Sequence, residues 1–149
     1  MAIVPQDVFR STVERYARYR TGYPADAVAG LAERLGLDSA ATVVDVGCGT
    51  GQLAVPLARH AGTVIAIDPV PEMLAAGRRS AGEVDNIVWQ LGEAGELGTL
   101  VPPDARAVTF AASYHWTDRS AVLETLDSRL PGGASVVVVN IWRGIAFAM

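Results

Sequence analysis

The chain has 149 residues, of which 50% are hydrophobic and 19% are charged, and its net charge is −4. This composition excludes a disordered chain and argues against nucleic acid as the main partner, because phosphate binding requires a basic face. The single cysteine, Cys48, excludes an internal disulfide and favours a reducing compartment. No apolar run is long enough to span a membrane, and no signal peptide is recognisable, so we expect a cytoplasmic protein without a membrane partner.

Helical and strand patterns alternate along the whole chain. Apolar spacing predicts helices over 7–20 and 25–35, strands over 42–46, 63–67, 86–91, 105–111 and 134–140, and helices over 52–61, 71–80 and 118–130. Strands that alternate with helices of about ten residues predict right-handed crossovers. The expected fold is therefore α/β, with a doubly wound, Rossmann-like and mostly parallel sheet.

We expect one domain over residues 1–149, which is long enough to bury its own core. Residues 1–36 would form an N-terminal helical cap, and residues 42–149 the Rossmann-like core. The segment 92–104 is rich in glycine and proline, which predicts a loop near the site.

A glycine-rich turn follows the first predicted strand. Residues 43–51 read Val-Val-Asp-Val-Gly-Cys-Gly-Thr-Gly, so Gly47, Gly49 and Gly51 precede the next helix. Glycines let the backbone approach a ligand closely, and a helix N-terminus offers free N–H groups to a carboxylate. A dinucleotide fingerprint needs its third glycine at position 52, where this chain has Gln52. The spacing therefore argues against a nicotinamide-dependent oxidoreductase, although this function stays open as an alternative to the two that are given below.

Two aspartates end the first two strands. Asp68 follows Gly47 at about the twenty-residue offset of an acid that accepts hydrogen bonds from ribose hydroxyls, which we favour over a helix cap before Pro69. Asp45 would orient the glycine turn, contact the cofactor or have a purely structural role. Cys48 has no base beside it and is more typical of a small buried residue than of a nucleophile. The two histidines lack metal-ligand spacing, so we predict no metal site.

This pattern resembles motif I of the class I S-adenosylmethionine-dependent methyltransferases, and the resemblance extends over nearly the whole chain. It implies S-adenosyl-L-methionine as the cofactor, with its ribose on Asp68 and its adenine near Val70 or Met73. The family's Gly-Asp-Ala step is here Gly92-Glu93-Ala94, which assigns Glu93 to the adenine amino group. The cofactor contacts that we expect are Tyr19, Arg20, Asp45, Gly47, Cys48, Gly49, Gly51, Asp68, Pro69, Met73, Glu93, Ala94 and Ala111.

Two further segments resemble a subset of the family that methylates small molecules. Ser113-Tyr114-His115-Trp116 resembles the aromatic segment that faces the transferable methyl group. It implies that His115 is catalytic and accepts a proton from a small-molecule acceptor, while Trp116 either walls the pocket or packs at the sheet edge. Residues 16–24 resemble an element that folds over the cofactor, where Arg20 would present a planar fork to the methionine carboxylate.

The resemblance ends soon after the fifth strand. Family members continue with a helix and an antiparallel hairpin, so we expect a class I methyltransferase fold that lacks its last two strands. A valine-rich strand at an uncovered edge predicts a homodimer through that edge, a piece of a longer protein, or cover by residues 141–149. Two functions stay open: methyl transfer to a small molecule, and a cofactor-binding domain that does not catalyse alone.

Overall fold

One parallel sheet of five strands forms the centre of the described residues. The structure, a computed structural model, describes residue 13 and residues 22–140. The helix expected over 7–20, with Tyr19 and Arg20, and the segment 141–149 lie outside the described residues. The strands stand in the order β3-β2-β1-β4-β5. Their bounds are β1 (Thr42–Val46), β2 (Thr63–Asp68), β3 (Ile87–Leu91), β4 (Ala107–Ala111) and β5 (Ser135–Val139).

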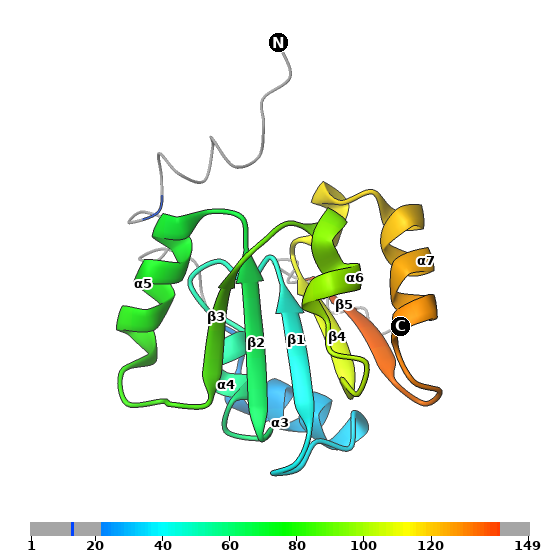
Figure 1. Ribbon diagram of the computed structural model, residues 1–149. Helices are drawn as coiled ribbons and strands as arrows, with labels where there is room; N and C mark the ends of the chain where they lie inside the picture. Colours follow the sequence, from blue (N-terminus) through cyan, green and yellow to red (C-terminus); the bar gives the residue numbers. More distant parts are fainter. Residues whose placement is uncertain (1–12, 14–21, 141–149) are drawn as a thin grey trace.

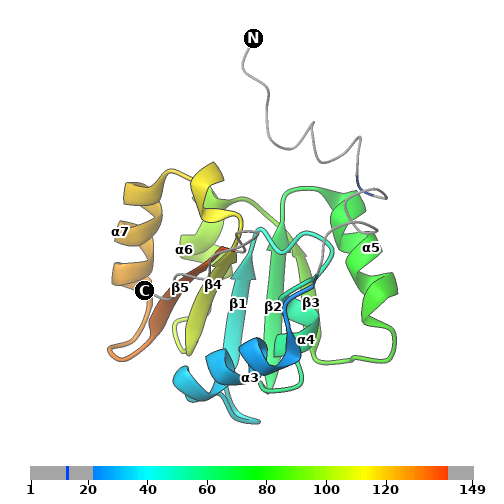
Figure 2. The same ribbon diagram turned by 180° about the vertical axis from the view of Figure 1, so that it is seen from behind.

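Helices cover both faces of this sheet. Figure 1 shows α6 and α7 in front of the sheet, and Figure 2 shows α3 on the opposite side. Among residue 13 and residues 22–140, no helix is both long and apolar enough to cross a membrane. The bounds are α3 (Ala25–Arg34), α4 (Ala54–Leu57), α5 (Pro71–Ala81), α6 (Leu97–Leu100) and α7 (Arg119–Arg129), with short 3-10 helices at η1 (Ala94–Glu96) and η2 (Tyr114–Trp116).

The core lies on both sides of the central strand β1. Val43 packs with residues of α3, α4 and α5, whereas Val44 packs with residues of α6 and α7. Both valines are fully buried, because successive residues of a strand point to opposite faces and both faces are covered. The continuous apolar run of this strand is explained by that double burial.

The order of the strands fixes where a ligand can bind. The chain proceeds outward from β1 through β2 to β3, and then returns to place β4 on the other side of β1. The loops that leave β1 and β4 therefore lead to helices on opposite faces of the sheet. In open parallel sheets, ligands bind in the crevice that forms at such a switch point.

The predicted strands agree with the structure to within two residues, but two other elements differ. The helix expected over 52–61 is reduced to α4. Pro56 has no N–H to donate to the carbonyl of Gln52, and after Ala58 the bonds tighten to Arg59 N–Pro56 O and His60 N–Leu57 O. The segment expected as a loop over 92–104 contains η1 and α6. A reciprocal capping box between Glu93 and Glu96 begins η1.

Candidate functional site

A cleft of about 240 Å³ lies at the carboxyl end of the sheet. Residues at or just after the ends of β1, β2, β3 and β4 contribute to it, so four separate loops meet around one space. Its lining consists of Val46, Gly47, Gly49, Asp68, Pro69, Val70, Met73, Glu93, Ala94, Gly95, Ala112, Ser113, Trp116 and Thr117. The cleft coincides with the switch point of the strand order, as the parallel sheet predicts.

The glycine turn after β1 adopts backbone angles that other residues rarely take. Gly47, Gly49 and Gly51 have φ values of 68°, 58° and 88°. A Cβ atom on Gly47 would lie 2.5 Å from the Cβ of Ser113, so the loops after β1 and β4 approach too closely for a side chain. The amide of Gly47 also donates to the carbonyl of Ile67 at 2.8 Å, which fixes the turn against the end of β2.

Asp68 holds this turn from the end of β2. Its Oδ2 accepts a hydrogen bond from the amide of Gly49 at 2.9 Å, and its Oδ1 accepts one from the amide of Val70 at 2.9 Å. The residue is 7% exposed, and burial raises the pKa of its carboxyl group, an effect that the bonds from Val70 and Gly49 partly counter. A carboxylate has about four acceptor positions, so two remain for a ligand in the cleft.

An apolar wall stands beside this carboxylate. Val70 and Met73 are almost fully buried and line the cleft, and they form a small cluster with Val13 and Ala76. Pro71 begins α5 at its first turn, where a missing N–H costs nothing, so the chain turns sharply from Asp68 into this wall. An acceptor for hydroxyl groups next to an apolar surface suits a ribose with its base attached.

The opposite wall follows β4. Ala112 has a φ of 54°, in the left-handed region that alanine rarely adopts, and its amide donates to the carbonyl of Val139 at 2.8 Å. The hydroxyl of Ser113 donates to the carbonyl of Val46 at 2.6 Å. These bonds hold the strained residue in place and direct the chain into η2. Trp116, which is 52% exposed, lies at the outer end of this wall.

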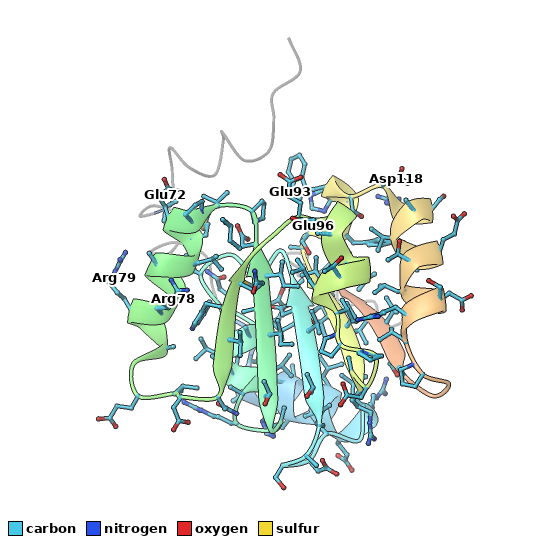
Figure 3. All side chains as sticks on the ribbon, in the orientation of Figure 1. Glu72, Arg78, Arg79, Glu93, Glu96 and Asp118 are labelled. Atoms are coloured by element: carbon cyan, nitrogen blue, oxygen red, sulfur yellow. The ribbon has the colours of Figure 1, made fainter. Side chains whose placement is uncertain are left out.

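Several carboxylates lie at the end of the sheet where the cleft is found. Figure 3 shows Glu93 and Glu96 together at the carboxyl end of the sheet, with Glu72 on α5 to one side and Asp118 at the start of α7 to the other. The Glu96 carboxylate accepts from the amide of Glu93 at 2.8 Å, and the Glu93 carboxylate accepts from the amide of Glu96, so both also cap η1. Among the described lining residues, the acidic ones are Asp68 and Glu93 and none is basic.

Seven of the predicted cofactor contacts line the cleft: Gly47, Gly49, Asp68, Pro69, Met73, Glu93 and Ala94. Asp45, Cys48, Gly51, Ala111 and the predicted catalytic residue His115 do not line it. His115 is exposed, and its ring centroid lies 4.8 Å from that of Trp116, at the outer wall. Tyr19 and Arg20 lie outside the described residues.

The residues of the motif that do not line the cleft have contacts in the core. Asp45 is fully buried, and its Oδ1 accepts from the hydroxyl of Thr109 at 2.7 Å, which joins β1 to β4. Burial, and then the charges of Asp45 and Asp68, raise the pKa of the Cys48 thiol well above its usual range. Such a thiol stays protonated and is a poor nucleophile. In the described part of the chain, no three His, Cys, Asp or Glu side chains are grouped to hold a metal ion.

Sequence reasoning did not find four lining residues: Val46, Gly95, Ala112 and Thr117. Their side chains are small or carry no distinctive chemistry. The one available signal was position, because each lies at the carboxyl end of a predicted strand or in the loop that follows it. The left-handed backbone conformation of Ala112 could not be predicted from the sequence, because alanine rarely adopts it.

Comparison with known proteins identifies the family. Residues 43–133 match the family described as "Methyltransferase domain". The chain belongs to the class I S-adenosylmethionine-dependent methyltransferases. It is 35% identical over 133 residues to an uncharacterised methyltransferase of Mycobacterium tuberculosis strain H37Rv, a match that covers 89% of this chain and 51% of the relative. The chain therefore spans about half the length of such relatives.

Other methyltransferases share parts of the sequence and the fold. A trans-aconitate 2-methyltransferase of Mycobacterium tuberculosis strain H37Ra is 36% identical over 107 residues, which covers 68% of this chain and 38% of the relative. The structure of magnesium protoporphyrin IX methyltransferase from Synechocystis with bound SAM superimposes with a TM-score of 0.66, at 22% identity, over 84% of this chain and 69% of that one. The fold expected from the sequence, a Rossmann-like class I methyltransferase sheet, is confirmed.

Proposed function

We propose that the cleft binds S-adenosylmethionine and that this chain transfers its methyl group to a small-molecule acceptor. The observation that supports this most directly is the buried Asp68 carboxylate, held by Gly49 and Val70 beside an apolar wall. Family membership supports the same cofactor.

Each part of the cofactor has a suitable group in the cleft. The remaining acceptor positions of Asp68 suit the ribose hydroxyls, and the apolar surface of Val70 and Met73 suits the adenine. The backbone of Gly47 and Gly49, which carries no side chain, suits the methionine end. The carboxylates around the cleft favour a ligand with a positively charged sulfonium.

The chemistry that we propose for this chain is positioning. When bound, the cofactor supplies an already activated methyl group on a sulfonium. The protein has to align the acceptor with that methyl group and exclude water, which accounts for much of the barrier reduction in such reactions. The wall formed by Ala112, Ser113 and Trp116 would face the acceptor, and His115 beside it would take up the acceptor's proton.

Several finer statements belong to this proposal. A small-molecule acceptor is supported by a relative that is named a trans-aconitate 2-methyltransferase. A cytoplasmic location is supported by the single, buried cysteine. The half-exposed outer strand β5 supports a homodimer through that edge. We also propose that residues 1–36 form a cap over the core of residues 42–149.

An alternative is a cofactor-binding domain that does not catalyse by itself. It is supported by the share of the relatives that the chain spans, which is 51%. The two proposals differ in one result: an incomplete domain binds the cofactor but transfers no methyl group to any acceptor offered, trans-aconitate included.

Calorimetric titration with S-adenosylhomocysteine and with NAD⁺ tests the binding proposal. We expect saturable one-site binding of S-adenosylhomocysteine and no binding of NAD⁺. D68A should abolish the binding, whereas D104A, which removes an exposed aspartate in the turn before β4, at the opposite end of that strand from the cleft, should not change it. Binding of NAD⁺ in preference to S-adenosylhomocysteine would contradict the proposal.

H115A tests the catalytic assignment. We expect turnover to fall by about a hundredfold, because general-base help is lost, while affinity for S-adenosylhomocysteine stays near that of the wild type. H60A, which removes the chain's other histidine, is the matched control and should behave like the wild type. The assay uses acceptors that lose a proton on methylation, such as phenols and alcohols, because a carboxylate such as trans-aconitate is already ionised near neutral pH. Unaltered turnover in H115A removes this residue from the mechanism.

A further inference from the structure

An aromatic ring lies against the glycine turn on the side away from the cleft. Trp89 of β3 places its six-membered ring between Gly51 of the turn and Gly77 of α5. A Cβ atom on Gly51 would lie 2.8 Å from Cη2 of this ring, and one on Gly77 would lie 2.4 Å from its Cζ3. Neither position admits a side chain while the ring is there.

A second contact joins the same helix to the same turn. The hydroxyl of Ser80 on α5 lies 3.2 Å from the carbonyl of Thr50 and 3.3 Å from the carbonyl of Gly77, so its one proton is shared between the turn and its own helix. The turn is therefore held at two successive residues, Thr50 by a hydrogen bond and Gly51 by the ring. Arg78 donates to the carbonyl of Trp89 at 3.3 Å, so α5 also holds the strand that carries the ring.

The two sides of the turn have different neighbours. Gly47 and Gly49 line the cleft, and Gly49 donates to Asp68. Gly51 does not line the cleft, and its conformation, with a φ of 88°, brings it against Trp89. The third glycine of the motif is thus explained by the ring behind it, together with Val55 of α4, whose Cγ2 would lie 2.9 Å from the added Cβ, and not by the ligand in front of it.

The sheet leaves room for this ring. Trp89 pairs in register with Ala66 of β2, a small and fully buried residue. The ring packs against the core cluster that also contains Leu53 and Ala54, just after the turn. A rigid ring between a helix and a turn transmits a displacement of one to the other, because protein interiors have few voids to absorb it.

We propose that Trp89 is a positioning residue for cofactor binding: its ring sets the position of the turn over 47–51 and so of the backbone at Gly47 and Gly49 that lines the cleft. This inference rests on the proposed function, since the ligand is the cofactor proposed above. It assigns to Gly77 and Ser80, which are outside the cleft, a share in the affinity for that cofactor.

G77A is the main test, because the added methyl group pushes the ring toward Gly51. We expect affinity for S-adenosylhomocysteine to fall by about tenfold, the scale of a displaced packing contact, and the Gly49 amide to exchange faster with solvent. G30A is the matched control: it makes the same change in α3, where nothing lies within 4 Å of the new methyl group. It should leave both measurements unchanged.

The double variant W89F/G77A tests whether the ring is the link. Phenylalanine lacks the ring atoms that meet the new methyl group, so affinity and Gly49 exchange should recover toward the wild type. A G77A protein that matches G30A in both measurements overturns the proposal. So does a defect that persists in full in the double variant, because the effect then does not pass through the ring.

Two further outcomes are also decisive. If G77A does not fold, W89F alone serves, because the gap it leaves should speed Gly49 exchange while the amides of α3 stay unchanged; equal Gly49 exchange overturns the proposal. If the wild type itself does not bind S-adenosylhomocysteine, the proposed function fails. Gly49 exchange needs no ligand, so it still decides whether the ring positions the turn.

Discussion

Asp68 has a structural role and a proposed ligand-binding role. Both of its carboxylate oxygens accept hydrogen bonds from backbone amides, one from Gly49 and one from Val70. The same carboxylate lines the cleft. Burial raises its pKa above the usual 3.8. Protonation of this one group should therefore change affinity and stability in opposite directions.

Affinity should fall on acidification. The ionised carboxylate is the better acceptor for ribose hydroxyls, so binding of S-adenosylhomocysteine should weaken as the pH falls through the raised pKa of Asp68. The weakening should begin at a higher pH than an ordinary aspartate would give. D68N, which keeps the shape but cannot ionise, should bind more weakly at neutral pH and lose this dependence. Calorimetry over a pH series measures it, and an identical pH dependence in D68N contradicts the assignment.

Stability without ligand should change the other way. The folded state holds the proton of Asp68 more tightly than the unfolded state does, because its folded pKa is raised. The contribution of this group to the free energy of unfolding therefore increases as the pH falls from the raised pKa toward 3.8. Urea denaturation of the wild type and D68N over that pH interval measures this contribution. The free energy of unfolding of the wild type should rise relative to that of D68N as the pH falls toward 3.8.

The site was predictable where chemistry is visible in the residue type. Gly47, Gly49 and Asp68 carry their properties in the sequence, and all three line the cleft. Gly51 has the same residue type but lies against Trp89, and nothing in a sequence pattern reports which partner a glycine accommodates. The left-handed Ala112 was equally invisible, because its conformation is imposed by Val139 and the neighbouring loops.

Among the elements, the buried strands were the most predictable. The run over 42–46 coincides with β1, since a strand covered on both faces must be apolar throughout. The helix after the turn was overestimated, because the apolar pattern continues beyond Ala58 although the helical hydrogen bonds tighten there. The two short helices within 92–104 were not predicted, because the glycines of this segment are typical of a loop. The Glu93–Glu96 capping box begins η1, and α6 follows it with one turn.

The cap of α7 provides a prediction for a single element. The carboxylate of Asp118 accepts from the amide of Ala121 at 3.1 Å, which satisfies one of the free amides of the first turn. D118A should lower the free energy of unfolding by about 1 kcal/mol, and D118S, which retains a capping oxygen, should lower it less.

Urea denaturation measures this effect. D26A is the matched control, because Asp26 lies inside the first turn of α3 and, among the described residues, accepts a hydrogen bond from its neighbour Ala27 alone. Equal stability losses in D118A and D26A would show that the cap does not stabilise α7.

At the scale of the whole molecule, the described sheet has two outer strands, β3 and β5. Val88 on β3 is 49% exposed and Val138 on β5 is 45% exposed. An exposed outer strand rich in β-branched residues can pair with another chain, and a lysine there opposes such pairing. The family, the parallel sheet and the position of the cleft were predictable from the sequence, whereas the state of association was not, because it depends on what covers these edges.

The homodimer that we propose through β5 predicts a specific effect of V138K. This variant should sediment as a monomer at concentrations where the wild type is a dimer, while V88K, the same change on the opposite outer strand, should remain a dimer. Analytical ultracentrifugation distinguishes these results. A wild type that stays monomeric, or a V138K that stays dimeric, contradicts association through β5.

A crystal structure of this chain with S-adenosylhomocysteine tests the central claim most directly. The account predicts ribose hydroxyls on the Asp68 carboxylate, adenine against Val70 and Met73, and the amino-acid end along Gly47 and Gly49. A ligand bound elsewhere, or a cleft that stays closed with Asp68 turned away from it, would contradict the account.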